Sequence, residues 1–196
     1  MVGAAGELFS IRTELYEPVP KNVILDDFII SLNICLRGYR IAYEPAAYAM
    51  EMPSASIGEE QKRKIRISAG AFQSMAMMKS LFNIFKYPLL SFQYVSHRVL
   101  RWTLCPVLLP VILLLNLLIV WKGGGWVYQA LLAGQVFFYL AAFISWILSK
   151  RHIKIKLLYV PYYFVFQNYC LYLGFIKHLK GQQSVLWEKA ERQSYS

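Results

Sequence analysis

The chain has 196 residues, a hydrophobic fraction of 57% and a formal net charge of +10. Soluble domains are roughly 45–50% apolar, so this composition argues against a wholly soluble protein. Many basic chains bind nucleic acid, but here the basic residues flank long apolar runs, which favours membrane lipids as partners and no nucleic acid. Cys35, Cys105 and Cys170 are too far apart in the sequence to predict a metal, redox or disulfide framework.

Residues 1–80 are mixed in polarity and predict short elements separated by loops. The stretch from Gly3 to Arg12 has two glycines followed by alternating apolar residues, which predicts a loop entering a short strand. A helix is expected to begin at Asp26-Asp27 and to end at Gly38, a residue suited to a left-handed cap. Residues 39–43 then predict a second strand.

A longer helix is expected over about residues 59–78. Ser56-Ile-Gly-Glu59 has the spacing of a capping box, which marks a helix N-terminus. Four residues of this helix, separated by three, four and three positions, share one face: Arg63, Arg66, Gly70 and Gln73. An alternative for this basic run is a helix face that contacts lipid headgroups.

Residues 81–100 predict an amphipathic helix that lies in the membrane interface. Apolar residues with helical spacing define one side: Phe85, Leu89, Phe92 and Val99. Polar residues with the same spacing define the other: Lys86, Gln93, His97 and Arg101.

Residues 101–180 predict a transmembrane region. Three apolar runs, 101–121, 126–148 and 157–176, reach the roughly 20 residues that span a bilayer. Gly123-Gly-Gly125 predicts a tight turn, so that the first two runs form a hairpin. A buried core helix is the alternative, chiefly for the third run, which contains Gln167 and Asn168. Polar residues within the runs also keep open a small transporter or channel subunit.

Basic residues predict the orientation of these spans. Four of them lie between the second and third runs: Lys150, Arg151, Lys154 and Lys156. Basic loops favour the cytoplasmic side, so residues 1–100 are expected to face the cytoplasm at an inner (plasma) membrane. A C-terminal tail over residues 181–196 completes the predicted organisation.

The segment from Asp26 to Pro45 resembles the Thr-Glu-Asp region of membrane-bound, processive family 2 glycosyltransferases, which include cellulose, hyaluronan and poly-N-acetylglucosamine synthases. It reads Asp26-Asp27-Phe-Ile-Ile-Ser-Leu32 and continues with Leu36-Arg-Gly-Tyr39-Arg-Ile-Ala-Tyr43-Glu-Pro45. The resemblance implies that Asp27 is the general base and that Asp26 contributes to substrate binding. Such a carboxylate takes the proton of the acceptor hydroxyl as it attacks the anomeric carbon. The local sequence alone favours the alternative of an ordinary helix cap.

A second segment, Arg63-Lys-Ile-Arg66-Ile67-Ser-Ala-Gly70-Ala-Phe-Gln73, resembles the Gln-x-x-Arg-Trp segment of the same family and the helix behind it. The resemblance places Arg66 at the leaving diphosphate, where a guanidinium donates two hydrogen bonds. It also assigns Arg63 and Gln73 to substrate binding. Ile67 stands where the family has a Trp that stacks on sugar, which puts processive synthesis in doubt.

The C-terminal segment Lys180-Gly-Gln-Gln-Ser-Val-Leu-Trp187-Glu-Lys-Ala-Glu-Arg192 is similar to the family's tail after the last span. There, Trp187 and Arg192 are expected at the acceptor exit or at a lid, with an ordinary interfacial Trp and a solvated Arg as the alternative. The family's donor-binding half carries an Asp-x-Asp motif that holds Mg²⁺ or Mn²⁺. This sequence contains no Asp-x-Asp, so no cofactor is expected on the chain itself.

The resemblance as a whole implies an α/β fold for residues 1–80, the acceptor half of a GT-A glycosyltransferase domain, followed by the interfacial helix and about three spans. It implies an inverting glycosyltransferase that moves a sugar from a nucleotide donor to a membrane-associated glycan or lipid. The chain is expected to be a truncated gene product, a fragment or one half of a split enzyme whose donor-binding half is a separate chain. The alternative is a non-catalytic membrane subunit in polysaccharide assembly or export.

Overall fold

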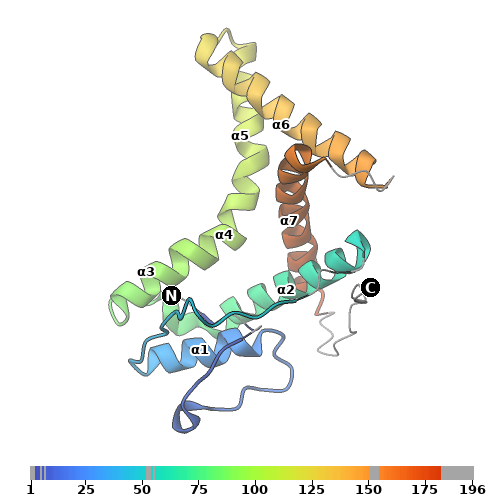
Figure 1. Cartoon of the computed structure of the whole chain (residues 1–196). Coiled ribbons are helices and arrows are strands. Elements are labelled where there is room, and N and C mark those ends of the chain that lie inside the picture. The colour runs from blue at the N-terminus through green and yellow to red at the C-terminus, as the bar shows by residue number, and fades with distance from the viewer. Residues whose placement is uncertain are drawn as a thin grey trace. The chain divides into compact units, whose positions relative to one another are not determined.

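The computed structural model describes residues 3, 4, 6, 8–51, 54, 56–150 and 155–181. These residues are 71% helical and contain no β-strand. The elements in chain order are η1 (Thr13–Leu15), α1 (Asp26–Leu36), α2 (Ile57–Met77), η2 (Lys79–Phe82), α3 (Pro88–Tyr94), η3 (Val95–Val99), α4 (Leu100–Trp102), α5 (Leu104–Trp121), α6 (Trp126–Lys150) and α7 (Lys156–Leu179) (Figure 1).

The expected α/β fold is therefore wrong for the part of the chain that the structure describes. Residues 39–43, predicted as a strand, are irregular, and Tyr39 and Tyr43 are 47% and 72% exposed. The described residues of the stretch from Gly3 to Arg12 form no strand either. A strand needs a neighbour for its backbone hydrogen bonds, and no other strand is present among the described residues to supply one.

The chain divides into two compact units. The first comprises Met1–Trp102 and Leu173–Ser196, and the second comprises Thr103–Tyr172. The last seven residues of α7 belong to the first unit.

Local signals in the first unit define its two main helices. The Ser56 hydroxyl accepts a hydrogen bond from the Glu59 amide at 3.2 Å, which confirms the predicted N-terminus of α2. Gly38, at φ 90°, follows the last turn of α1, and its amide donates to the carbonyl of Cys35 at 3.0 Å. This left-handed position confirms the predicted end of α1, because an L side chain is strained there.

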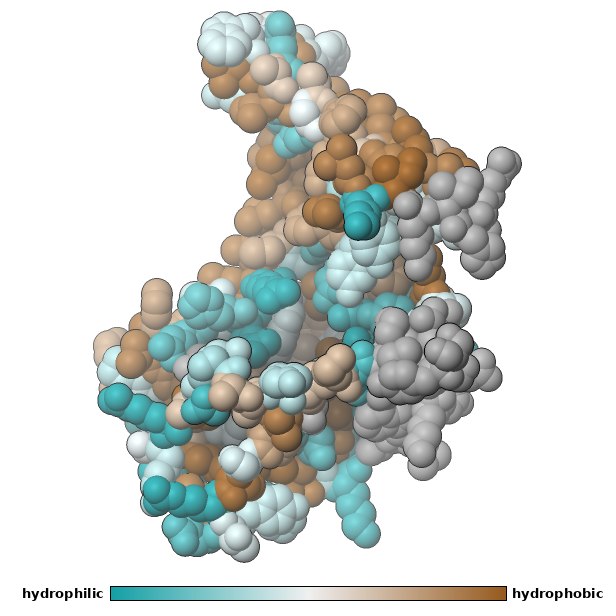
Figure 2. Space-filling model, in the orientation of Figure 1, coloured by the Kyte–Doolittle hydropathy of each residue, from teal (hydrophilic) through white to brown (hydrophobic). Residues whose placement is uncertain are grey.

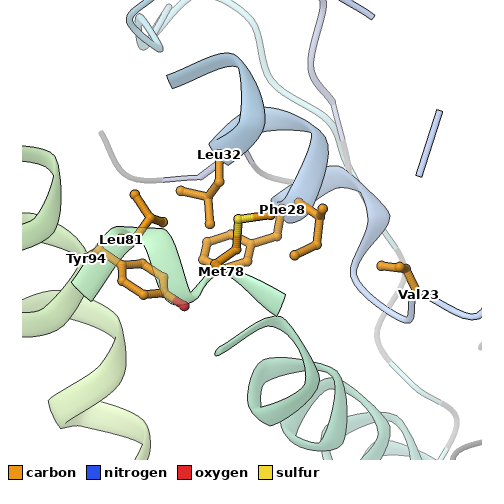
Figure 3. Close-up of a cluster of buried hydrophobic side chains, with 7 residues drawn as sticks. Val23, Phe28, Leu32, Met78, Leu81 and Tyr94 are labelled. Carbon is orange, nitrogen blue, oxygen red and sulfur yellow. The ribbon is translucent and has the colours of Figure 1, made fainter. Parts of the chain in front are cut away.

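A single apolar cluster joins α1, the end of α2 and the segment from η2 to α3 (Figure 3). Its buried members are Val23, Phe28, Ile29, Leu32, Met78, Leu81 and Tyr94. Phe28 is the aromatic centre, with ring centroids 6.4 Å from Tyr94 and 5.8 Å from Trp102. The helix that begins with Asp26-Asp27 therefore shares its core with the helices that precede the first apolar run.

The predicted amphipathic helix over residues 81–100 is segmented. A turn over residues 83–87 separates η2 from α3, and helical structure then continues through η3, a π-helical turn, to Trp102. Leu81 and Tyr94 are fully buried in the core, while Phe85, Leu89 and Phe92 are exposed.

The second unit contains a helical hairpin of α5 and α6, joined at the predicted glycine turn (Figure 1). Both helices are long and apolar enough to cross a membrane, with mean hydropathies of 2.6 and 2.0 over Leu104–Trp121 and Trp126–Ser149. Their surfaces are hydrophobic in Figure 2. The Asn116 amide donates to the Gln135 side-chain oxygen at 3.0 Å, a polar link between two otherwise apolar helices.

The third predicted span corresponds to α7, a helix of 24 residues. Its Tyr172 hydroxyl donates to the Pro106 carbonyl of α5 at 2.5 Å, and Phe164 makes an edge contact with Phe138 of α6. The test of length and hydropathy selects α5 and α6 within the described residues, so the membrane role of α7 stays a prediction.

The buried Tyr94 hydroxyl generates a stability prediction. It is fully buried and has no hydrogen-bond partner among the described residues. Tyr94→Phe removes this desolvated group and keeps the ring, so it should stabilise the chain by about 1 kcal/mol at pH 7. Tyr94→Ala, the control that removes the ring, should cost about 3–5 kcal/mol. Thermal unfolding in detergent measures both.

Tyr94 should also make the stability of the chain fall at alkaline pH. Burial raises the pKa of Tyr94 to about 12, from 10.0 for an ordinary tyrosine. A folded-state pKa above the unfolded value means that stability is complete below pH 10 and falls by about 1.4 kcal/mol per pH unit between the two values. Tyr94→Phe should lack this component of the decline between pH 10 and 12. Equal declines in the two proteins would contradict the burial of this hydroxyl.

Candidate functional site

A contact between α2 and the loop before α1 positions the candidate site. The Ile24 amide donates to the side-chain oxygen of Gln73 at 3.0 Å, and the Gln73 side-chain amide donates to the Asn22 carbonyl at 2.7 Å. One turn earlier, Gly70 lies so close to this loop that an added Cβ would be 2.8 Å from side-chain atoms of Ile24 and Leu25. We call these interactions the α2 contact.

The α2 contact joins the second segment that carries the family resemblance to the loop immediately before the first. Gln73 and its partners are separated by 49 and 51 residues in the sequence. The loop that it holds leads directly into Asp26 and Asp27, the first two residues of α1. The amide of Gln73, predicted to bind substrate, is used here to position this loop.

Asp26 and Asp27 differ in their surroundings. Asp26 is exposed, whereas Asp27 is half-buried and lies beside the N-terminal segment, where an added Cβ on Gly6 would be 2.8 Å from its carboxylate oxygen. The N-cap of α1 is Leu25, which makes no side-chain cap bond, so neither aspartate occupies the N-cap position of the alternative interpretation. Both carboxylates lie in the first turn, where the helix dipole stabilises negative charge.

Arg98 is a neighbour of Asp27 that the sequence did not assign to the site. Its guanidinium lies 5.3 Å from the ring centre of Phe28 and 5.8 Å from that of Trp102. Burial and the nearby Arg101 lower the pKa of Arg98 from its usual value, and the negative charge of Asp27 acts in the opposite direction. No pattern in the sequence identifies Arg98 as a site residue. In the structure it lies in the π-helical turn η3, and such turns are frequent at functional sites.

The two arginines predicted on α2 lie in different settings. Arg66 is half-buried and lies one turn before Gly70, on the helix face that makes the α2 contact. Arg63 forms an ion pair with Glu60 at 3.2 Å near the helix N-terminus. Trp187 and Arg192 lie outside the described residues. The described residues include no group of three or more His, Cys, Asp or Glu side chains that could hold a metal ion.

Comparisons with known proteins found no relative of this chain. No family model, no curated protein and no solved structure matches the chain.

The close approach at Gly70 predicts a large effect for a single methyl group. Gly70→Ala should displace the loop before α1 and destabilise the first unit by about 1–3 kcal/mol. Gly58→Ala is the matched control on the same helix, because its Cβ meets only the Ser56 hydroxyl at 3.6 Å. That variant should be neutral or stabilising by up to about 1 kcal/mol. Similar unfolding temperatures for the two variants would contradict the α2 contact.

The interactions of Glu60 near the N-terminus of α2 should contribute to the stability of the chain in a pH-dependent way. Burial alone would raise its pKa, but a hydrogen bond from Ser54 and the charges of Arg63 and Lys64 lower the pKa from 4.5. A depressed pKa means that the contribution is complete above the unfolded value and is lost as the pH falls through the folded one. Glu60→Gln should therefore cost about 1 kcal/mol at pH 7 and progressively less below pH 4.5. A cost that stays constant down to pH 3 would contradict the charged interaction.

Proposed function

We propose that the chain supplies the acceptor-side, membrane-embedded part of an inverting glycosyltransferase, with Asp27 as the general base. The observation that carries this proposal is the α2 contact. It joins Gln73 and Gly70 of the second resembling segment to the loop that leads directly into Asp26 and Asp27, with hydrogen-bonded residues 49 and 51 positions apart in the sequence. The residues assigned to this reaction lie on the helical elements α1, α2 and η3, so no β-sheet of this chain is needed to hold them.

The proposed reaction assigns a step to each group. The Asp27 carboxylate takes the proton from an acceptor hydroxyl while the hydroxyl oxygen forms a bond to the anomeric carbon of the donor sugar. The bond from that carbon to the nucleotide diphosphate breaks, and the sugar configuration inverts. Arg66 donates hydrogen bonds to the departing diphosphate. Arg98 holds a positive charge near the base.

The donor side of the reaction is assigned to a second polypeptide segment. A nucleotide sugar and its Mg²⁺ or Mn²⁺ need an Asp-x-Asp motif in the resembling family, and this sequence has none. The acceptor is a membrane-associated glycan or lipid, which agrees with the two membrane-length helices α5 and α6. Placement of residues 1–100 on the cytoplasmic side of an inner membrane is part of the proposal.

The test compares sugar transfer by wild-type and Asp27→Asn chains in membranes. Each chain is produced together with the polypeptide encoded immediately upstream, and the membranes receive radiolabelled UDP-glucose, UDP-N-acetylglucosamine or GDP-mannose. Asp27→Asn keeps the side-chain size and removes the base, so incorporation should fall about 10²- to 10⁴-fold. Glu14→Gln is the control for loss of a carboxylate, because Glu14 is exposed on η1, and it should retain wild-type incorporation.

Two results would count against this proposal. Equal incorporation by Asp27→Asn and wild type would remove Asp27 as the base. No incorporation by wild type, with no Asp-x-Asp segment encoded upstream, would favour the alternative of a non-catalytic membrane subunit.

A further inference from the structure

The segment from Lys79 to Trp102 has more apolar surface than its core uses. One side is buried against α1 through Leu81 and Tyr94, which are both fully buried. A second set of large apolar side chains is exposed, with fractions of 47%, 51%, 95%, 66% and 61% for Phe82, Ile84, Phe85, Leu89 and Phe92. Five exposed large apolar side chains within the eleven residues 82–92 mark an interaction surface, because soluble surfaces rarely expose so many together.

Hydrogen bonds fix the turn that displays these side chains. The Tyr87 amide donates to the Asn83 carbonyl at 3.1 Å, and the Lys86 amide donates to the Asn83 side-chain oxygen at 3.1 Å. The buried Ser91 hydroxyl donates to the same Asn83 carbonyl at 3.1 Å, which ties the turn to α3. Phe85 is therefore held outward by an ordered turn, and Leu89 and Phe92 follow on one face of α3.

The charged residues within the segment itself are all basic. Lys79 and Lys86 are exposed within the segment. The sequence contains no Asp or Glu between Gln61 and Trp187, although fifteen of its 21 Lys and Arg residues lie there. Exposed apolar side chains on a segment whose charged residues are all basic are complementary to anionic lipid headgroups above acyl chains.

Along the chain, the segment is followed directly by a candidate membrane span. The helical stretch that begins at Pro88 ends at Trp102, and α5 begins at Leu104. At a rise of about 1.5 Å per residue, Phe92 is about 18 Å from the start of α5 along the chain. A bilayer that contains α5 is therefore within reach of Phe92 along the chain. Neither the charge of the segment nor its place in the chain points to a protein partner in the same way.

We propose that Phe82, Ile84, Phe85, Leu89 and Phe92 form a docking surface that inserts into an anionic phospholipid bilayer, with Lys79 and Lys86 at the headgroups. We call it the Phe85 surface. It is independent of the proposed glycosyl transfer, because it needs neither Asp27 nor a donor. Its insertion orients the core that α3 shares with α1 relative to the membrane.

Site-directed spin labelling of the full chain in lipid vesicles tests this proposal. Cysteines are introduced as Phe85→Cys and Leu89→Cys, with Lys21→Cys on the exposed loop before α1 as the control. The background carries Cys35→Ala, Cys105→Ala and Cys170→Ala, since these three cysteines are free. Collision rates with oxygen, which concentrates in acyl chains, and with a water-soluble nickel chelate are measured in phosphatidylcholine vesicles with and without 30% phosphatidylglycerol.

The expected result is a local and lipid-dependent insertion. The oxygen-to-nickel ratio should be roughly threefold or more above the Lys21 value at both Phe85 and Leu89 with phosphatidylglycerol, and lower in pure phosphatidylcholine. Lys79→Gln with Lys86→Gln should reduce this dependence on phosphatidylglycerol. Ratios equal to the Lys21 value in both vesicle types would overturn the proposal. Labels shielded from both reagents would indicate a protein contact and would also overturn it.

A second measurement avoids the cysteine substitutions. A benzophenone amino acid replaces Phe85 in the otherwise wild-type chain, in the same anionic vesicles, and is activated with light. Mass spectrometry should find phospholipid adducts at residue 85. Adducts confined to protein, or to neither protein nor lipid, would contradict insertion of the Phe85 surface.

Discussion

The hydrogen bonds of Gln73 to the backbone of Asn22 and Ile24 are the constraint on which the rest of the first unit depends. Within the loop before α1 the Val23 amide donates to the Pro20 carbonyl at 3.1 Å, but the Asn22 carbonyl and the Ile24 amide need partners from elsewhere in the fold. α2 supplies them through one amide side chain, and Gly70 permits the close approach. The position of Asp27 follows from this contact, because α1 begins two residues after Ile24.

Phe28 extends this arrangement toward α3, η3 and α4. It follows Asp27 directly and packs on Tyr94 and Trp102, while the guanidinium of Arg98 lies over its ring. One core thus links the first turn of α1 to the segment that displays the Phe85 surface. The proposed docking surface and the proposed base therefore belong to the same compact unit and share its core.

The sequence predicted the helix caps and the long apolar helices, which depend on nearby residues. It did not predict the features that depend on tertiary neighbours. The capping box at Ser56, the left-handed Gly38 and the apolar helices α5 and α6 were predictable, since each signal lies within a few residues or in one continuous run. The predicted strands were wrong because strand formation requires a partner that the described residues do not provide. Arg98 was missed because its relation to Asp27 depends on packing across about seventy residues. The roles of Asp27 and Arg66 stay predictions.

Amide hydrogen exchange at Ile24, measured in lipid vesicles by mass spectrometry with single-residue resolution, tests the central claim most directly. If Gln73 holds the loop before α1, the Ile24 amide is protected in the wild-type chain, and Gln73→Met raises its exchange rate at least about tenfold because the acceptor is lost. Gln93→Met, the same change on α3, leaves that rate unchanged. Rapid exchange at Ile24 in the wild-type chain, or equal rates in all three proteins, would contradict the account.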